Sequence, residues 1–196
     1  MQNSFIKGIA AISLVFLSSS AVANTSIEQI KKRAAEINEM KELLQSADPA
    51  LRLAAIDTMQ NSEDLAMREL AFSAGFNSSD EAVVALTIRN KFTEIDNFAV
   101  TLTKPEGGGK QMETYDYVGG RVMFRISSYD KAKGTITNRT DINSNASGAR
   151  QSTISGLNLL LESANCKGEF KLADDLAYRG MMTCYKHQFP AEINIF

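Results

Sequence analysis

The chain of 196 residues contains no tryptophan, one histidine, two cysteines and three prolines. A Ser–His–Asp triad or a Cys–His pair would have to use His187, the single histidine, and a zinc site would need more ligands than this one residue supplies. The sequence also lacks the G-x-S-x-G and H-E-x-x-H motifs of common hydrolases. The sequence therefore predicts no catalytic residues, no metal ligands and no cofactor, and an enzyme is the less favoured class.

An excess of basic residues is also absent, because 21 Lys and Arg stand against 23 Asp and Glu, for a net charge of −2. This balance argues against nucleic acid or an anionic lipid surface as a partner. The charges are uneven along the chain. Residues 24–92 carry 8 basic and 11 acidic side chains, whereas residues 93–196 carry 12 of each.

Residues 1–23 have the pattern of a secretory signal peptide. Lys7 is their only charged residue, Ile9–Leu17 is a short apolar core, and residues 21–23 read Ala-Val-Ala, a small-residue cleavage site. The apolar run is too short for a membrane span, although an uncleaved anchor is the alternative. We therefore expect a bacterial Sec-type signal cleaved after Ala23, a periplasmic or secreted mature chain, and no membrane span after cleavage.

The two cysteines, Cys166 and Cys184, would then lie in an oxidising compartment, where disulfides persist. Only one intramolecular pairing is available, and the spacing is not that of a C-x-x-C redox pair. We therefore expect a structural disulfide, which would contribute about 3 kcal/mol to stability for a loop of this size.

A sixteen-residue repeat follows the first helical segment. Asp48, Asp64 and Asp80 begin three copies, and the second and third copies match the first at several apolar and polar positions. The matched positions are Ala50, Ala66 and Ala82; Arg52 and Arg68; Ile56, Phe72 and Ile88; Asn61 and Asn77. Each aspartate suits a helix N-cap, and apolar residues at helical spacing then predict about eleven helical residues.

The segment Asp-Pro-Ala-Leu-Arg that begins at Asp48 and the repeat over residues 43–92 resemble HEAT-like α-helical repeats. The resemblance implies stacked short helices that act as a protein or ligand scaffold, with no fixed functional residue. A plain bundle of equally long helices is the alternative. We expect the repeated alanines to permit close helix approach, and Gly75 to serve as a left-handed C-cap.

Residues 25–45 precede the repeat and predict one longer helix. Its apolar stripe has heptad-like spacing and consists of Ile27, Ile30, Ala34, Ile37 and Leu44, with Lys41 as the one polar member. Such a stripe either packs on the repeats of the same chain or forms a coiled-coil seam with a partner.

The pattern changes near Phe92 to short alternating runs separated by turn residues, which predicts antiparallel strands. The predicted strands are Asn97–Thr103, Gln111–Val118, Arg121–Ser128, Gly134–Arg139, Thr153–Leu161, Lys167–Leu172, Tyr178–Tyr185 and Ala191–Phe196. The predicted fold is thus α+β, with a helical repeat domain over residues 24–92 and a β-sandwich or small barrel over residues 93–196. The last strand either closes the sheet or forms an edge for another chain.

Three segments superficially resemble chemical motifs. Gly107–Lys110 resembles a phosphate loop but lacks the first glycine, the Ser or Thr after the lysine, and a predicted helix. Asp141–Asn145 resembles the start of a calcium loop, but Ala146 occupies the required glycine position. Asp174 and Glu162 are the carboxylates that a hydrolase would need, and nothing in the sequence brings them together.

The leading hypothesis is a non-catalytic interaction module that binds another envelope or extracellular protein, or a second copy of itself. The alternative is a carrier of a small apolar ligand or lipid, with a β-barrel lined by Val118, Val122, Phe124 and Ile126. A carboxylate-dependent hydrolase is a minor third possibility.

Overall fold

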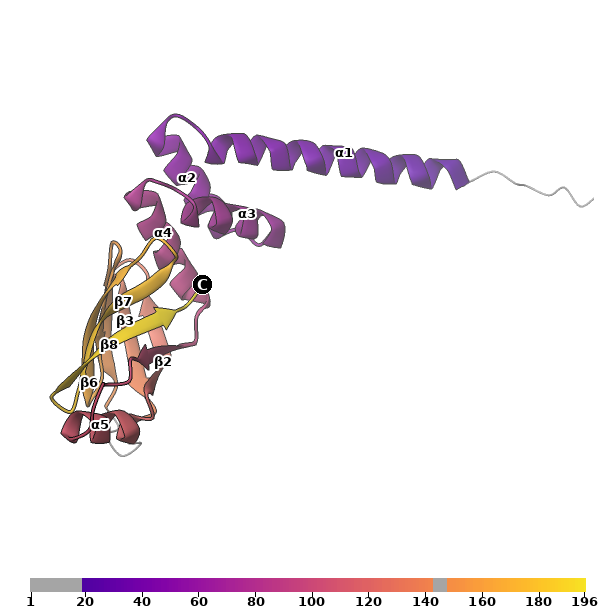
Figure 1. Ribbon diagram of the computed structural model, residues 1–196. Coiled ribbons are helices and arrows are strands. Elements are labelled where there is room, and N and C mark those ends of the chain that lie inside the picture. The colour runs from indigo at the N-terminus through magenta and orange to yellow at the C-terminus, as the bar shows by residue number, and fades with distance from the viewer. Residues whose placement is uncertain (1–18, 143–147) are drawn as a thin grey trace, which may run out of the picture. The chain divides into compact units, whose positions relative to one another are not determined.

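The computed structural model describes residues 19–142 and 148–196, with side chains described from Ser26 onward within these ranges. The helices are α1 (Ser19–Leu44), α2 (Pro49–Gln60), α3 (Leu65–Phe76), α4 (Glu81–Lys91), the 3-10 helix η1 (Phe92–Glu94) and α5 (Lys110–Val118). The strands are β1 (Asn97–Leu102), β2 (Arg121–Asp130), β3 (Thr135–Thr140), β4 (Arg150–Ser155), β5 (Asn158–Glu162), β6 (Cys166–Leu172), β7 (Ala177–Cys184) and β8 (His187–Asn194). The mixed helix and sheet content confirms the predicted α+β class (Figure 1).

The chain divides into two units, one that ends at Glu39 and one from Met40 to Phe196. The first unit contains most of α1, and within it Ile27 and Ile30 are 50% and 65% exposed. No helix among the described residues is both long enough and apolar enough to cross a membrane. Most of the predicted signal segment lies outside the described residues, so its cleavage stays a prediction.

Helices α2, α3 and α4 each begin at one of the repeated aspartates. The Asp48 side chain accepts hydrogen bonds from the amides of the first turn of α2, and Pro49 occupies the first helical turn. Asp64 and Asp80 cap α3 and α4 in the same way. These bonds satisfy amides that have no partner within the helix, so the sixteen-residue spacing sets where each helix starts.

The equivalent apolar positions of the three helices are all buried: Ile56 is 1% exposed, Phe72 4% and Ile88 0%. The repeated alanines, in contrast, are exposed and do not mediate helix contact, contrary to the sequence prediction. Close approach occurs instead at Gly75, where an added Cβ would overlap the Thr87 side chain. Gly75 is therefore a packing residue inside α3, and the C-cap of this helix is Asn77.

The eight strands form a closed antiparallel barrel in sequence order. The barrel is closed by β8, which pairs with β7 along its length and with β1 through Glu192 and Ala191. The last strand therefore closes the sheet, and of the two predicted β architectures the barrel is present. Alternate residues point inward, so Val100, Val122 and Phe124 are each 0% exposed.

Two predicted strands are wrong. Gln111–Val118 is part of helix α5, whose C-cap Gly119 adopts the left-handed conformation at φ 73°. Thr153–Leu161 is two strands, β4 and β5, because Gly156 turns the chain at φ 58°.

Helices cover both ends of the barrel (Figure 1). At one end Ile88 of α4 and Phe92 of η1 join the hydrophobic core of the barrel. At the other end Val118 of α5 is buried in the same core, and the Tyr115 ring packs on Phe189 of β8 at 6.3 Å between centroids. We call these the helical end and the disulfide end, since Cys166 and Cys184 lie at the second.

Candidate functional site

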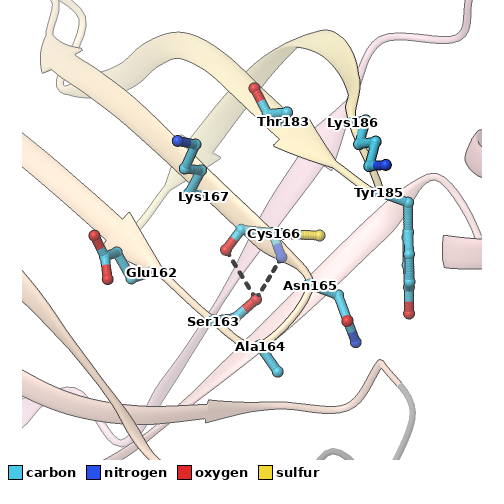
Figure 2. A pocket seen from close by; sticks show the side chains of 9 residues that line it. All are labelled: Glu162, Ser163, Ala164, Asn165, Cys166, Lys167, Thr183, Tyr185 and Lys186. Carbon is cyan, nitrogen blue, oxygen red and sulfur yellow. Dashed lines mark hydrogen bonds between the residues drawn. The ribbon is translucent and has the colours of Figure 1, made fainter.

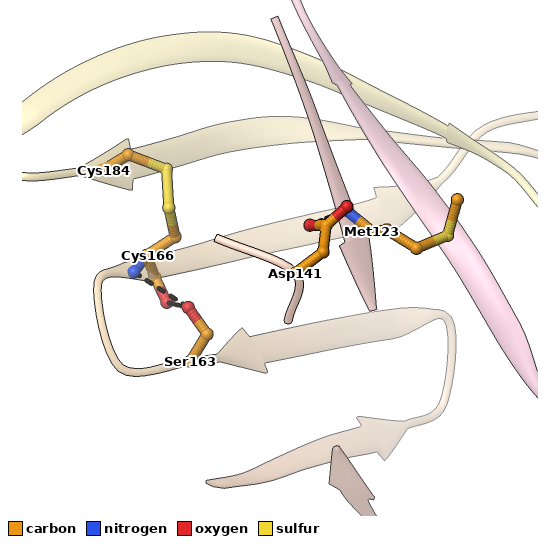
Figure 3. Close-up of a disulfide and its surroundings, with 5 residues drawn as sticks. All are labelled: Met123, Asp141, Ser163, Cys166 and Cys184. Carbon is orange, nitrogen blue, oxygen red and sulfur yellow. Dashed lines mark hydrogen bonds between the residues drawn. A yellow bond between two sulfur atoms is a disulfide. The ribbon is translucent and has the colours of Figure 1, made fainter. Parts of the chain in front are cut away.

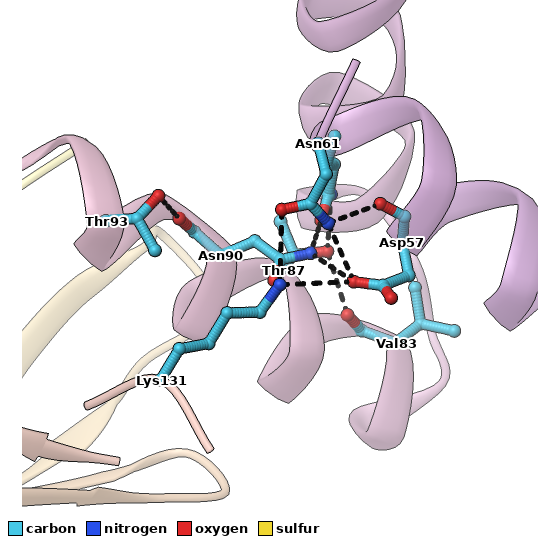
Figure 4. A network of polar contacts seen from close by, with 8 residues as sticks. Asp57, Asn61, Val83, Thr87, Asn90, Thr93 and Lys131 are labelled. Atoms are coloured by element: carbon cyan, nitrogen blue, oxygen red, sulfur yellow. Dashed lines mark hydrogen bonds and ion pairs between the residues drawn. The ribbon is translucent and has the colours of Figure 1, made fainter. Parts of the chain in front are cut away.

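The helices α2–α4 are joined to one another by buried polar side chains (Figure 4). Gln60 of α2 donates to the Ala71 carbonyl of α3 and to Thr87 Oγ1 of α4, at 3.1 and 3.0 Å. Asn90 of α4 donates to Gln60 Oε1 at 2.7 Å and to Asp57 Oδ1 at 3.0 Å. Because Gln60, Thr87 and Asn90 are almost fully buried, these bonds fix one arrangement of the three helices.

The same network reaches the barrel through Lys131 in the turn between β2 and β3 (Figure 4). The Lys131 ammonium lies 3.5 Å from Asp57 Oδ1 and 3.2 Å from Asn61 Oδ1. Apolar contact adds to this link, since the Phe76 ring of α3 lies 4.6 Å from the ring of Phe196 at the chain end. The helical platform α2–α4 is thus attached to the barrel by both polar and aromatic contacts.

A cleft of about 460 Å³ lies where the helical platform meets the barrel loops. Its floor is apolar and comes from both parts: Phe76, Val84, Leu157, Leu172 and Leu176. Its rim is polar and includes Asn77, Ser78, Ser79, Glu81 and Asp174. We call this the junction cleft. Its volume is in the range of ligand sites, which often lie between structural units and combine an apolar surface with a few polar groups.

Leu176 in the β6–β7 loop lines the junction cleft with a backbone conformation that leucine rarely adopts. Its φ is 63°, in the left-handed region where glycine or asparagine is normally found. A backbone hydrogen bond from Leu176 to the Ala173 carbonyl closes the loop at 3.0 Å. The loop is further held by Arg179, which donates to both oxygens of Asp175 at 2.7 Å.

The repeat residues singled out in the sequence do not line this cleft. Asp48, Asp64 and Asp80 act as helix caps. Arg52 contacts Asp80 Oδ2 at 3.2 Å, and Arg68 lies 3.8 Å from Glu94 Oε1. Each arginine thus connects its helix to the second helical element after it, α2 to the start of α4 and α3 to η1. Hydrogen bonds from the Ala82 amide and from Arg52 lower the pKa of Asp80.

The disulfide between Cys166 and Cys184 is present, as predicted (Figure 3). It links β6 to β7 at the disulfide end, and both cysteines are buried. The Ser163 hydroxyl accepts from the Cys166 amide and donates to its carbonyl, both at 2.9 Å, so the preceding turn is also fixed. Nearby, Asp141 Oδ1 accepts from the Met123 amide at 3.1 Å.

A second, open pocket of about 420 Å³ lies beside the disulfide (Figure 2). Glu162, Lys167 and Lys186 contribute charges of both signs, and Tyr185 contributes a ring. Tyr185 and Lys186 form the β7–β8 turn at φ 46° and 74°. Burial raises the pKa of Tyr185, whose ring meets the edge of Tyr117 at 5.4 Å between centroids.

The structure also shows where the segments that superficially resemble chemical motifs lie. A helix does follow Gly107–Lys110, contrary to the prediction, since α5 begins at Lys110, but the other phosphate-loop residues are still missing. In the calcium-like segment, residues 143–147 lie outside the described residues. Asp174 lies at the helical end and Glu162 at the disulfide end, so roughly 13 Å of strand β5 separates the two ends.

Of the residues named for a hollow barrel, Val122 and Phe124 are 0% exposed, and Val118 of α5 is buried in the same core. Ile126 is partly buried and packs against that core. Among the described residues, no group of three or more His, Cys, Asp or Glu side chains is placed to hold a metal ion. Comparisons with protein-family models, curated proteins and solved structures found no match for the chain.

Sequence reasoning missed the residues that form the junction cleft. Leu157, Leu172 and Leu176 come from loops or strand ends of the barrel, and Phe76 and Val84 come from helices. Their separation in the sequence hides the cleft, since only the tertiary arrangement brings them together. The one local signal was the pair of predicted strands Lys167–Leu172 and Tyr178–Tyr185, which imply a loop between them but do not place it at the same cleft as α4.

Proposed function

We propose that this is a periplasmic or secreted protein that binds another envelope or extracellular protein and does not itself catalyse a reaction. The observation that carries the proposal is the junction cleft, in which Phe76 and Val84 of the helices face Leu157 and Leu176 of the barrel loops. A surface formed by two attached parts, with an apolar floor and a polar rim, suits the capture of a protein segment.

Two further features support the proposal. The disulfide fits an oxidising compartment outside the cytoplasm. The helices α2, α3 and α4 have 12, 12 and 11 residues, matching aspartate caps and matching buried positions, which supports HEAT-like repeat ancestry and a scaffold role. For the carrier and hydrolase alternatives, no observation among the described residues favours either one.

Site-specific photo-crosslinking tests the proposal. A photoreactive phenylalanine analogue at Leu157, in the cleft, is expected to capture one protein in the native host. The same analogue at Arg125, exposed on the outer face of β2, is the control and should not capture it. The captured protein, purified separately, should then bind the mature chain in a fixed ratio by calorimetry. Identical adducts from both positions, or no binding by the purified candidate, would contradict the proposal.

A further inference from the structure

The rim of the junction cleft carries two carboxylates that have no cationic partner among the described residues. Glu81 lies in the first turn of α4, and Asp174 lies in the β6–β7 loop. Neither forms an ion pair or a side-chain hydrogen bond with any described residue. Their neighbours differ in this respect, because Asp80 is held by Arg52 and Asp175 by Arg179.

The charge of the cleft is therefore uncompensated. Among the described residues that line it, none is lysine, arginine or histidine. The helical portion of the chain is acidic as well, with 8 basic and 11 acidic side chains over residues 24–92. Charge complementarity at interfaces speeds encounter and rejects partners of the same sign, so a negative rim favours a cationic partner.

The floor of the cleft requires an apolar group from the same partner. Val84 and Leu176 are only partly buried and pack against the barrel core, so both keep surface toward the cleft. Leu176 adopts a left-handed φ of 63°, which is unfavourable for a residue with a Cβ. Glycine would form this loop without that cost, but it would supply no side chain to the floor. Strain kept in this way is typical of binding sites.

From these observations we infer that the junction cleft binds a segment of a partner protein in which an apolar side chain lies next to a lysine or arginine. The apolar side chain enters the floor between Val84 and Leu176, and the cationic group lies between Glu81 and Asp174. This inference rests on the proposed function and adds the chemistry of the bound segment.

A library of random twelve-residue peptides, displayed on phage and selected on the full mature chain, tests the inference. Selected peptides are expected to share an apolar residue beside a lysine or arginine. A synthetic peptide of that consensus should shift the NMR signals of Ser79, Val84 and Leu176. The double substitution Glu81→Gln with Asp174→Asn should weaken its binding about fivefold to tenfold, because it removes two exposed ion pairs with the cationic group of the peptide. Added salt should weaken binding in the wild-type chain more than in this variant.

The matched control is Asp116→Asn with Glu169→Gln, which removes two exposed carboxylates of α5 and β6 away from the cleft and should leave binding unchanged. Selected peptides without a basic residue, unchanged binding by the cleft variant, or failure to select any peptide would overturn the inference. Peptides that bind the cleft without a charge preference would still leave the interaction function standing. That function fails separately if crosslinking at Leu157 yields no specific partner.

Discussion

At the scale of single residues, the clearest electrostatic contact is between Asp175 and Arg179 in the loop that borders the junction cleft. Hydrogen bonds from Arg179 lower the pKa of the Asp175 carboxyl from 3.8 to about 2. Both oxygens accept from the guanidinium, so the charged form of the carboxylate is favoured over the protonated form.

This pKa predicts how acid affects the loop. Because the pKa is lower in the folded chain than in the unfolded chain, the contact stabilises the fold above about pH 4 and is lost as the pH falls toward 2. NMR titration should give a midpoint of about 2 for Asp175 and a clearly higher one in Arg179→Gln. An Asp175 midpoint that does not change in Arg179→Gln would contradict the assignment.

Gly75 shows how one residue sets the packing of the helices. Helix propensity alone predicts that Gly75→Ala stabilises α3 by about 1 kcal/mol. Steric contact predicts the reverse, since a Cβ would overlap Thr87 and approach Gln60 Nε2 in the buried network. We expect a net loss of about 1–3 kcal/mol, measured as a lower urea midpoint with an unchanged m-value.

Gly108→Ala is the control for that substitution. Gly108 has no atom within 4 Å of an added Cβ and does not adopt a positive φ, so its replacement should change stability by less than about 1 kcal/mol. A stabilised Gly75→Ala chain would show that the helices separate more easily than the packing of Gln60 and Thr87 indicates.

At the scale of elements, the sequence predicted the helices and strands that are marked by local residue patterns. The aspartate caps fixed the starts of α2–α4, and strict alternation identified strands such as β1 and β6. Helix α5 was predicted as a strand, for which only Tyr115 and Tyr117 have the alternating spacing. Met112, Tyr115 and Val118 are spaced three apart and fit the helix that packs over the disulfide end of the barrel. The turn at Gly156 was missed because apolar residues continue through Leu157 into β5.

The β6–β7 hairpin carries the one covalent link among these elements. Cys166 and Cys184 are 18 residues apart, and closing such a loop contributes about 3 kcal/mol by restricting the unfolded chain. We expect Cys166→Ala with Cys184→Ala to lower the free energy of unfolding by about 2–4 kcal/mol in urea. A reductant should lower the stability of the wild-type chain similarly and leave the double variant unchanged. If a reductant left the stability of the wild-type chain unchanged, the cross-link would add little to the other contacts of the hairpin.

At the scale of the whole molecule, the sequence predicted a boundary near Phe92, and the change from helix to strand does occur there. The sequence did not indicate how closely the segments on either side are connected. Phe92 is 1% exposed and belongs to the core of the barrel, while Lys91 and Arg68 of the helices both contact Glu94. Phe92 and Arg68 carry no local signal of these contacts, since their partners are distant in the sequence and their positions depend on the complete fold.

These contacts predict that α2–α4 and the barrel unfold together. NMR signals from the buried methyl groups of Ile56 and Ile88 report on the helices, and those of Ile136 and Ile193 report on the barrel. Both pairs should disappear in one transition with a common midpoint.

Phe92→Ala should lower that midpoint for both pairs, because truncating a buried phenylalanine costs about 3–5 kcal/mol. Tyr117→Ala, which removes a ring that is 63% exposed, should lower it far less. Loss of the helical signals well before the barrel signals would instead mean that the junction cleft opens as the helices detach, and that its two walls are not rigidly joined.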